Sequence, residues 1–225
     1  MVEILKDAAF QRGVFALHKL LCKYELSMKK IFFLLLIIGA GWKFYKQSGQ
    51  VSLGPGVLAS EAPHQESIGS SVSRRIDDYT ITVLAKFRIK AKVLSKENYY
   101  LDRGADLSPT DLALGWGNMS DEVILDKIEI SQSGRFYRWH VKSFPISRRE
   151  IETHSANMHL IPVSDAVKSD IDRVRKGEII EMSGSLVAVI SHRDGWHWKS
   201  SQTRNDTGAG ACELILVDSL HIIAP

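Results

Sequence analysis

The longest regular pattern in the chain begins at residue 79, where apolar and polar residues alternate through "YTITVLAKFRIKAKVLS". A period of two predicts a half-buried β-strand, because successive side chains of a strand point to opposite faces. At about 3.3 Å per residue this strand is too long to stay straight in an ordinary domain, so we expect it to coil as barrel strands do. Its apolar face consists of Tyr79, Ile81, Val83, Ala85, Phe87, Ile89, Ala91 and Val93.

The opposite face of this strand is basic and includes Lys86, Arg88, Lys90 and Lys92. Such a stripe is either a binding surface or a solvated face whose lysines keep a sheet edge from pairing with another chain. Solvation and edge protection by lysine are the commoner explanation of such a stripe.

The segments that follow alternate between strand and helix patterns. A hairpin is indicated by two strand-like runs joined by "SQSG", and Ser147 and Ser164 are suited to cap short helices. The predicted elements are a hairpin at 123–141, a helix at 147–154, a strand at 159–163, a helix at 165–176, and strands at 178–190 and 212–223.

Residues 108–115 carry the signals of a helix start. Ser108 suits the N-cap, Pro109 suits the first helical position, and Asp111 follows three residues after the cap. We therefore predict a short helix that ends at Gly115. Trp116 then lies between two glycines, either as a lid packed on the core or as an exposed platform for a ligand.

This order of elements predicts a mainly β (α+β) fold. It resembles an OB-like five-stranded barrel with short helical inserts, preceded by an N-terminal membrane anchor helix. The resemblance covers residues 79–223, and we place the β-barrel-like domain at 76–225. A distorted β-sandwich would give the same order of elements.

Residues 28–46 have the layout of a signal anchor or transmembrane segment. Two lysines precede an apolar run from Ile31 to Trp42, and aromatic and basic residues follow it. The run is shorter than the roughly 20 residues of a straight transmembrane helix. A cleaved signal peptide and a single-pass anchor are both open, and the lack of an A-x-A cleavage site favours the anchor.

The segments on either side of this run are assigned separately. Residues 1–27 are either an amphipathic helix or a mis-assigned start, with Met28 as the natural initiator. Residues 47–75 are rich in Ser and Gly, which predicts a flexible linker.

The formal charge of +3 belongs to the N-terminal segment. Residues 1–50 contain eight of the 29 Lys and Arg and three of the 26 Asp and Glu, so residues 51–225 carry −2. This distribution favours a membrane surface, and we expect no nucleic-acid partner. Together with the anchor it predicts a location in the bacterial inner membrane with the domain facing the periplasm, or export if the signal is cleaved.

Polar side chains are densest in "THSANMHLIP" at residues 153–162. His154, Ser155 and His159, with Cys212, are the catalytic candidates of an envelope hydrolase. Histidines five residues apart in a strand point to opposite faces, and the chain has no G-x-S-x-G motif. The alternative is a junction whose polar side chains satisfy backbone groups. We favour a protein that is not an enzyme and expect no metal site.

We also expect no cofactor. The glycine-rich "DTGAGA" precedes a predicted strand, whereas nucleotide-binding loops precede a helix whose N-terminus meets the phosphate.

The preferred function is a membrane-anchored envelope binding or scaffold domain. OB-like barrels bind ligands on one face, and aromatic rings can stack on sugars. The candidate ligand-binding residues are Trp116, Trp139, Asn157, Trp196, Trp198, Arg204 and Asp206. The expected partners are the membrane and either a glycan or peptidoglycan fragment or another envelope protein.

Four segments together, "SPTDLALGWGNMSD", "EISQSGRFYRW", "HSANMHLIP" and "SSQTRNDTGAGACEL", resemble a family of bacterial exported or membrane-anchored proteins. The resemblance implies a location in the envelope and supplies no catalytic residue.

Overall fold

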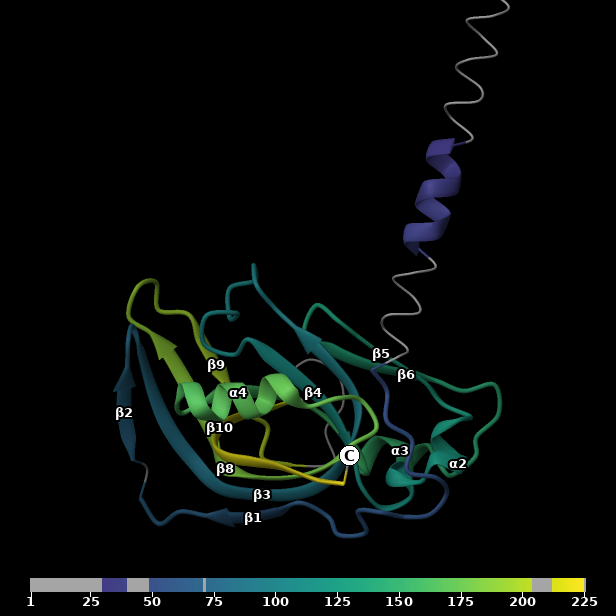
Figure 1. Cartoon of the computed structure of the whole chain (residues 1–225). Helices are drawn as coiled ribbons and strands as arrows, with labels where there is room; N and C mark the ends of the chain where they lie inside the picture. Colours follow the sequence, from purple (N-terminus) through teal and green to yellow (C-terminus); the bar gives the residue numbers. More distant parts are fainter. Residues whose placement is uncertain (1–29, 40–48, 71, 204–211, 225) are drawn as a thin grey trace, which may run out of the picture. The chain divides into compact units, whose positions relative to one another are not determined.

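The computed structural model of the chain describes residues 30–39, 49–70, 72–203 and 212–224 (Figure 1). The chain divides into two units, Met1–Gly49 and Gln50–Pro225. In the first unit, residues 30–39 of the predicted anchor are helical. Among the described residues, no helix combines the length and the apolar character that a membrane span requires. The anchor therefore stays a prediction.

The second unit holds the strands and the remaining described helices. Its strands are β1 (His64–Ser67), β2 (Ser73–Ile76), β3 (Tyr79–Asn98), β4 (Thr110–Gly115), β5 (Glu129–Ser133), β6 (Phe136–His140), β7 (Ser155–Pro162), β8 (Ile179–Ser191), β9 (His197–Lys199) and β10 (Glu213–Ala224). Its helices are the 3-10 helix η1 (Gly117–Ser120), α2 (Glu122–Leu125), α3 (Arg148–Thr153) and α4 (Asp165–Arg173).

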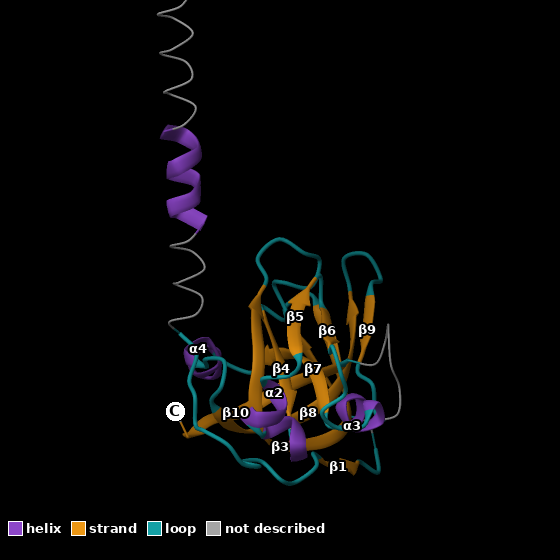
Figure 2. Cartoon of the chain, turned by 90° about the vertical axis from the view of Figure 1, so that its right-hand side faces the viewer, coloured by secondary structure: helices purple, strands orange, loops and turns teal. Residues whose placement is uncertain are grey.

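Five of these strands pair in a ring, in the order β3-β4-β7-β10-β8 and back to β3. Neighbours in the ring are antiparallel, except that β7 and β10 are parallel. β1 and β2 pair with β3, β9 pairs with β8, and β5 and β6 form a separate hairpin beside β4 and β7 (Figure 2). The predicted mainly β fold is therefore confirmed.

β3 is the long strand that the alternating pattern predicts, and it curves along the whole barrel (Figure 1). Its register against β8 shifts between Val83 and Ala85, which is a β-bulge at Leu84. Because of the bulge, Tyr79 belongs to a different hydrophobic cluster from Phe87. The prediction of one continuous apolar face is therefore wrong at this point.

The predicted helix at 108–115 is also wrong, because this segment forms β4. β4 pairs with β3 on one side and with β7 on the other, and all six of its residues are buried. Leu112 and Leu114 alternate into the core, which is the period of a strand. Pairing on both sides satisfies the backbone and outweighs the local capping signal of Ser108. The helical insert comes later, at η1 and α2.

The main hydrophobic core fills the ring, and α4 adds Val167 and Ile171 to it, followed by Val174 directly after the helix. The helix begins where the sequence predicts, because Ser164 Oγ accepts a hydrogen bond from the backbone N–H of Val167 over 3.3 Å.

We expect Ser164→Ala to lower the free energy of unfolding by about 1 kcal/mol, since the first turn of α4 loses its cap. Urea denaturation of the full-length chain in an uncharged detergent measures the change. Ser169→Ala is the matched control, because Ser169 is an exposed hydroxyl on the same helix. Equal losses in both variants would contradict the capping role.

Much of the predicted linker at 47–75 belongs to the second unit and is ordered within it. Residues 64–67 and 73–76 are β1 and β2, and residues 50–59, which we call the strap, run along η1 and α2. The backbone N–H groups of Leu58 and Ala59 donate to Ser120 Oγ, and Val51 N–H donates to the Lys176 carbonyl. The strap needs few apolar side chains to stay attached, because its backbone N–H groups donate the hydrogen bonds.

Candidate functional site

The outer face of β4 and β7 carries buried polar side chains. Asp111 of β4 stands opposite His159 of β7, and Nδ1 of His159 lies 2.8 Å from Oδ2 of Asp111, an ion-pair distance without hydrogen-bond alignment. Asn157 shares this face, donating to Asp111 Oδ2 over 3.4 Å and accepting from Gln132 of β5 over 2.6 Å. The side chain of Asp111 is 0% exposed, so its charge has to be compensated by the protein.

Arg135 compensates this carboxylate from the turn between β5 and β6. Its Nη1 donates to Oδ1 of Asp111 and to the Ser108 carbonyl, each over 2.8 Å. Its Nε and Nη2 form a bidentate pair with Asp102, over 3.0 and 2.8 Å. The backbone φ of Arg135 is 70°, in the left-handed region that side chains other than glycine rarely adopt. These contacts hold the strained turn so that the guanidinium faces β4.

Aromatic rings enclose the same group. Cζ of Arg135 lies 3.8 Å from the centre of the Tyr99 ring and 5.6 Å from that of Trp198. The Trp198 ring also lies 4.6 Å from the ring of His159. The cation is therefore held between π-faces in a site that water reaches poorly, where such contacts are strongest.

A second arginine, Arg103, continues the network along the loop between β3 and β4. It makes a bidentate pair with Asp194 over 3.1 and 2.9 Å, and donates to Tyr79 Oη over 2.8 Å and to Ser191 Oγ over 3.0 Å. Its Cζ lies 4.8 Å from the centre of the Trp196 ring. Arg103 therefore ties this loop to the turn between β8 and β9.

The two arginines shift the pKa values of their partners. The hydrogen bonds from Arg103 lower the pKa of Asp194 to about 2. Burial acts to raise the pKa of Asp102, but the hydrogen bonds and charge of Arg135 outweigh it and hold that pKa below its usual range. Burial raises the pKa of Tyr99 to about 12. At neutral pH the network therefore has charged carboxylates facing charged guanidinium groups.

Three connections of the barrel meet through these contacts, and we call them together the rim: loop 99–109, turn 134–135 and turn 192–196. Tyr100 and Leu101, directly before the clamped Asp102, point into solvent, with exposed fractions of 82% and 99%. The ion pairs of Arg103 and Arg135 fix this loop. Tyr100 and Leu101 can therefore contact a partner without the loss of conformational entropy that a flexible loop would pay on binding.

The catalytic candidates at the start of β7 have structural partners. Ser155 Oγ donates to the Ile151 carbonyl over 2.6 Å and accepts from Tyr137 Oη over 3.1 Å. His154 ends α3, and its Nδ1 lies 3.2 Å from the Glu150 carbonyl. These contacts fit a junction, whereas His159 belongs to the rim network with Asp111.

The other predicted residues are spread over the molecule. Trp196 and Trp198 lie together, with ring centres 5.6 Å apart. Trp116 is buried in the main core, and Trp139 packs edge-on to Phe144, 6.2 Å away. Cys212 is half-buried next to β10. Arg204 and Asp206 lie outside the described residues. In the part of the chain that the structure describes, no three His, Cys, Asp or Glu side chains are close enough to hold a metal ion.

Sequence reasoning missed Asp111, Arg135 and Asp102. The sequence did contain a strand pattern around Asp111. In "TDLALG" the apolar Leu112 and Leu114 alternate with the other residues, which would place Asp111 on the opposite face of a strand. No pattern marks Arg135, whose role depends on a turn that meets two other segments in space.

A comparison of the chain with protein-family models, with curated proteins and with solved structures finds no match. Any inference about function therefore rests on the geometry of the rim and of the surrounding barrel.

Proposed function

We propose that this chain is a membrane-anchored envelope binding or scaffold domain, built on an OB-like barrel, which recognises another envelope protein at its rim. The OB-like assignment is supported by the closed order of five strands and by α4, which comes before the fourth ring strand. In such barrels the second and third strands, with the loops after the first and fourth strands, form the ligand site. Here those elements are β4, β7, loop 99–109 and the segment after β8.

The β5–β6 hairpin covers part of that site. Gln132 bonds to Asn157, Tyr137 bonds to Ser155, and Arg135 bonds to Asp111, so the middle of the β4–β7 face is occupied by the chain itself. The accessible part of the site is then the rim, where the connecting loops reach solvent.

The observation that carries the proposal is the exposure of Tyr100 and Leu101 on a loop fixed by Arg135 and Arg103. A protein partner is favoured over a glycan because the ring faces that would stack on sugars are in use. Arg103 lies over Trp196, and Arg135 and His159 lie against Trp198. An exposed Tyr beside an exposed Leu is a surface of the kind that protein interfaces bury.

The location in the envelope is a proposal from the N-terminal segment. It is supported by the lysines at 29 and 30, by the apolar run that follows, and by the helix at 30–39. Under this proposal the anchor holds the chain in the bacterial inner membrane and the barrel faces the periplasm.

The test is site-specific photocrosslinking in intact bacterial cells that express the full-length chain. A photoreactive phenylalanine analogue replaces Leu101, and in the matched control it replaces Phe144, which is 55% exposed and follows β6 at the end opposite to turn 134–135. We expect a discrete protein adduct from position 101 only, which Tyr100→Ser abolishes.

Two outcomes would overturn the assignment. Equal adducts at both positions, or none at position 101, would remove the rim as a protein-binding surface. If Tyr100→Ser instead abolishes co-sedimentation of the chain with purified peptidoglycan, the ligand is a glycan.

A further inference from the structure

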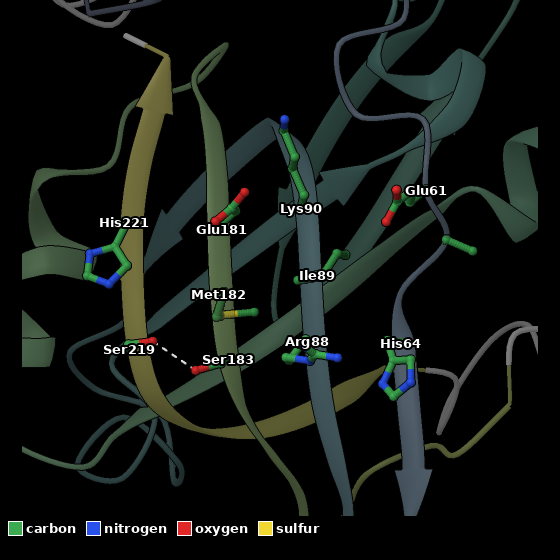
Figure 3. A pocket seen from close by; sticks show the side chains of 11 residues that line it. Glu61, His64, Arg88, Ile89, Lys90, Glu181, Met182, Ser183, Ser219 and His221 are labelled. Atoms are coloured by element: carbon green, nitrogen blue, oxygen red, sulfur yellow. Dashed lines mark hydrogen bonds between the residues drawn. The ribbon is translucent and has the colours of Figure 1, made fainter.

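A groove away from the rim is lined by polar side chains that the proposed function does not use. Its volume is about 400 Å³, and it lies across β1, β3, β8 and β10, beside residue 61 (Figure 3). The polar residues that line it are Glu61, His64, Arg88, Lys90, Glu181, Ser183, Ser219 and His221, and the apolar ones are Ala62, Ile89 and Met182.

The strand register arranges these side chains in two rows. In the first row, His64 of β1 pairs with Arg88 of β3, Arg88 with Ser183 of β8, and Ser183 with Ser219 of β10. Every member of this row can donate a hydrogen bond, and the two serine hydroxyls are 2.8 Å apart. A continuous row of donors across four strands is a surface suited to an anion.

The second row is mixed in charge. Lys90 of β3 pairs with Glu181 of β8, which pairs with His221 of β10, and Glu61, on the segment that leads to His64, also lines the groove (Figure 3). The carboxylates balance the two permanent cations, Arg88 and Lys90. A ligand that fits both rows therefore has an anionic end for the donors and hydroxyl or amine groups for the carboxylates.

The basic stripe of β3 is divided between structural and uncommitted side chains. Lys92 pairs with Glu122 over 2.8 Å, and Lys96 donates to carbonyls at the end of α4, as over 2.9 Å to Ile171. Over the described residues, Arg88 and Lys90 have no hydrogen bond or ion pair within the protein. The two basic side chains that line the groove therefore have no structural task among the described residues, and the same holds for Lys86, which lies outside the groove.

Protection of a sheet edge does not explain Arg88. At Arg88, β3 pairs with β1 on one side and with β8 on the other, so the strand has no free edge there. At Lys90, which lies between the stretches paired with β1 and with β4, β3 pairs with β8 alone, so Lys90 can also protect this short edge.

We propose that this groove binds the phosphate group of a phosphate ester. The forked guanidinium of Arg88 donates to two phosphate oxygens, in the geometry that makes arginine a phosphate ligand. Ser183 and Ser219 share one hydrogen bond, so one of their two hydroxyls donates to the phosphate, and the imidazole of His64 completes the donor row. Glu181 and Lys90 contact the polar groups carried by the ester. The ester is either a soluble metabolite or a lipid headgroup.

Isothermal titration of the full-length chain, in an uncharged detergent and a phosphate-free buffer, tests the proposal with two probes. Inorganic phosphate represents the soluble source, and dihexanoyl phosphatidylglycerol represents the headgroup. We expect saturable binding of at least one probe, weakened about tenfold by Arg88→Gln, since charge-assisted hydrogen bonds are lost. Lys86→Gln is the matched control: it removes the same charge from the same strand, outside the groove.

The two probes distinguish the source of the phosphate ester. Binding of phosphate alone identifies a soluble ester, and tighter binding of the lipid identifies a headgroup. Saturation by neither probe overturns the proposal. An equal loss in Arg88→Gln and Lys86→Gln also overturns it, because the effect is then that of overall charge. Thermal unfolding of both variants checks that the exposed substitutions leave the barrel intact.

Discussion

Arg135→Met is expected to lower the free energy of unfolding by about 4 kcal/mol, the cost of breaking a buried ion pair from one side. The substitution removes the guanidinium from Asp111, whose carboxylate in the rim network then keeps only His159 and Asn157 as side-chain partners. It also releases Asp102 and the Ser108 carbonyl. Methionine keeps most of the side-chain volume, so the loss reports the charge and the hydrogen bonds more than the packing.

Urea denaturation followed by tryptophan fluorescence measures this change. Arg138→Met is the matched control, because Arg138 lies on the same hairpin, is exposed, and bonds only to Ser133 among the described residues; we expect a change within about 0.5 kcal/mol. Adding Asp111→Asn to Arg135→Met should recover part of the loss, because the uncompensated charge is gone. A double variant that is less stable than Arg135→Met would show that charge burial is not the cause.

The sequence predicted the elements whose signals are local and agree with their surroundings. α4 combines a cap at Ser164 with an apolar stripe, and both are present in the structure. Its end was predicted at residue 176, before Gly177, whereas the helix ends at Arg173 with Val174 as its C-cap. The hairpin likewise has Tyr137 and Trp139 on its inner face and Phe136 on its exposed face, as the alternation requires.

Prediction failed where a local signal disagreed with the tertiary context. Residues 108–115 have both a capping pattern and a short strand pattern, and neither is decisive within six residues. β4 is a strand because β3 and β7 offer it a partner on each side, which the sequence of β4 does not record.

The candidate site was predictable only in part for the same reason. Asn157, His159 and Trp198 attract notice as polar or aromatic residues in dense segments. Their common environment is created by Arg135 and Asp111, which are 24 residues apart in sequence and meet only because turn 134–135 folds onto β4. Single-sequence patterns report periodicity along a segment, and they carry no signal for contacts of this kind.

The strap gives the second large effect. Glu122 accepts hydrogen bonds from the backbone N–H groups of Leu53 and Gly54 over 2.8 and 3.0 Å, and from Ser52 Oγ over 2.7 Å. It also pairs with Lys92, whose side chain is 3% exposed. Burial acts to raise the pKa of Glu122, but the hydrogen bonds from Lys92, Leu53 and Ser52 outweigh it and lower that pKa to about 2. A single carboxylate thus binds residues 52–54 of the strap and compensates a buried ammonium.

We expect Glu122→Gln to lower the free energy of unfolding by about 3 kcal/mol at pH 7, because the ammonium of Lys92 loses its counter-charge. The pKa of Glu122 is lower in the folded chain than in the unfolded chain, so its stabilising effect is present above about pH 4.5 and is lost as the pH falls towards 2. The gap between the two proteins should therefore narrow across this window. Urea denaturation between pH 7 and pH 2.5 measures it, with hydrogen exchange of residues 50–59 to follow the strap. Glu129→Gln, an exposed glutamate of β5, is the control. A gap that stays constant with pH would show that the carboxylate charge is not what stabilises the strap.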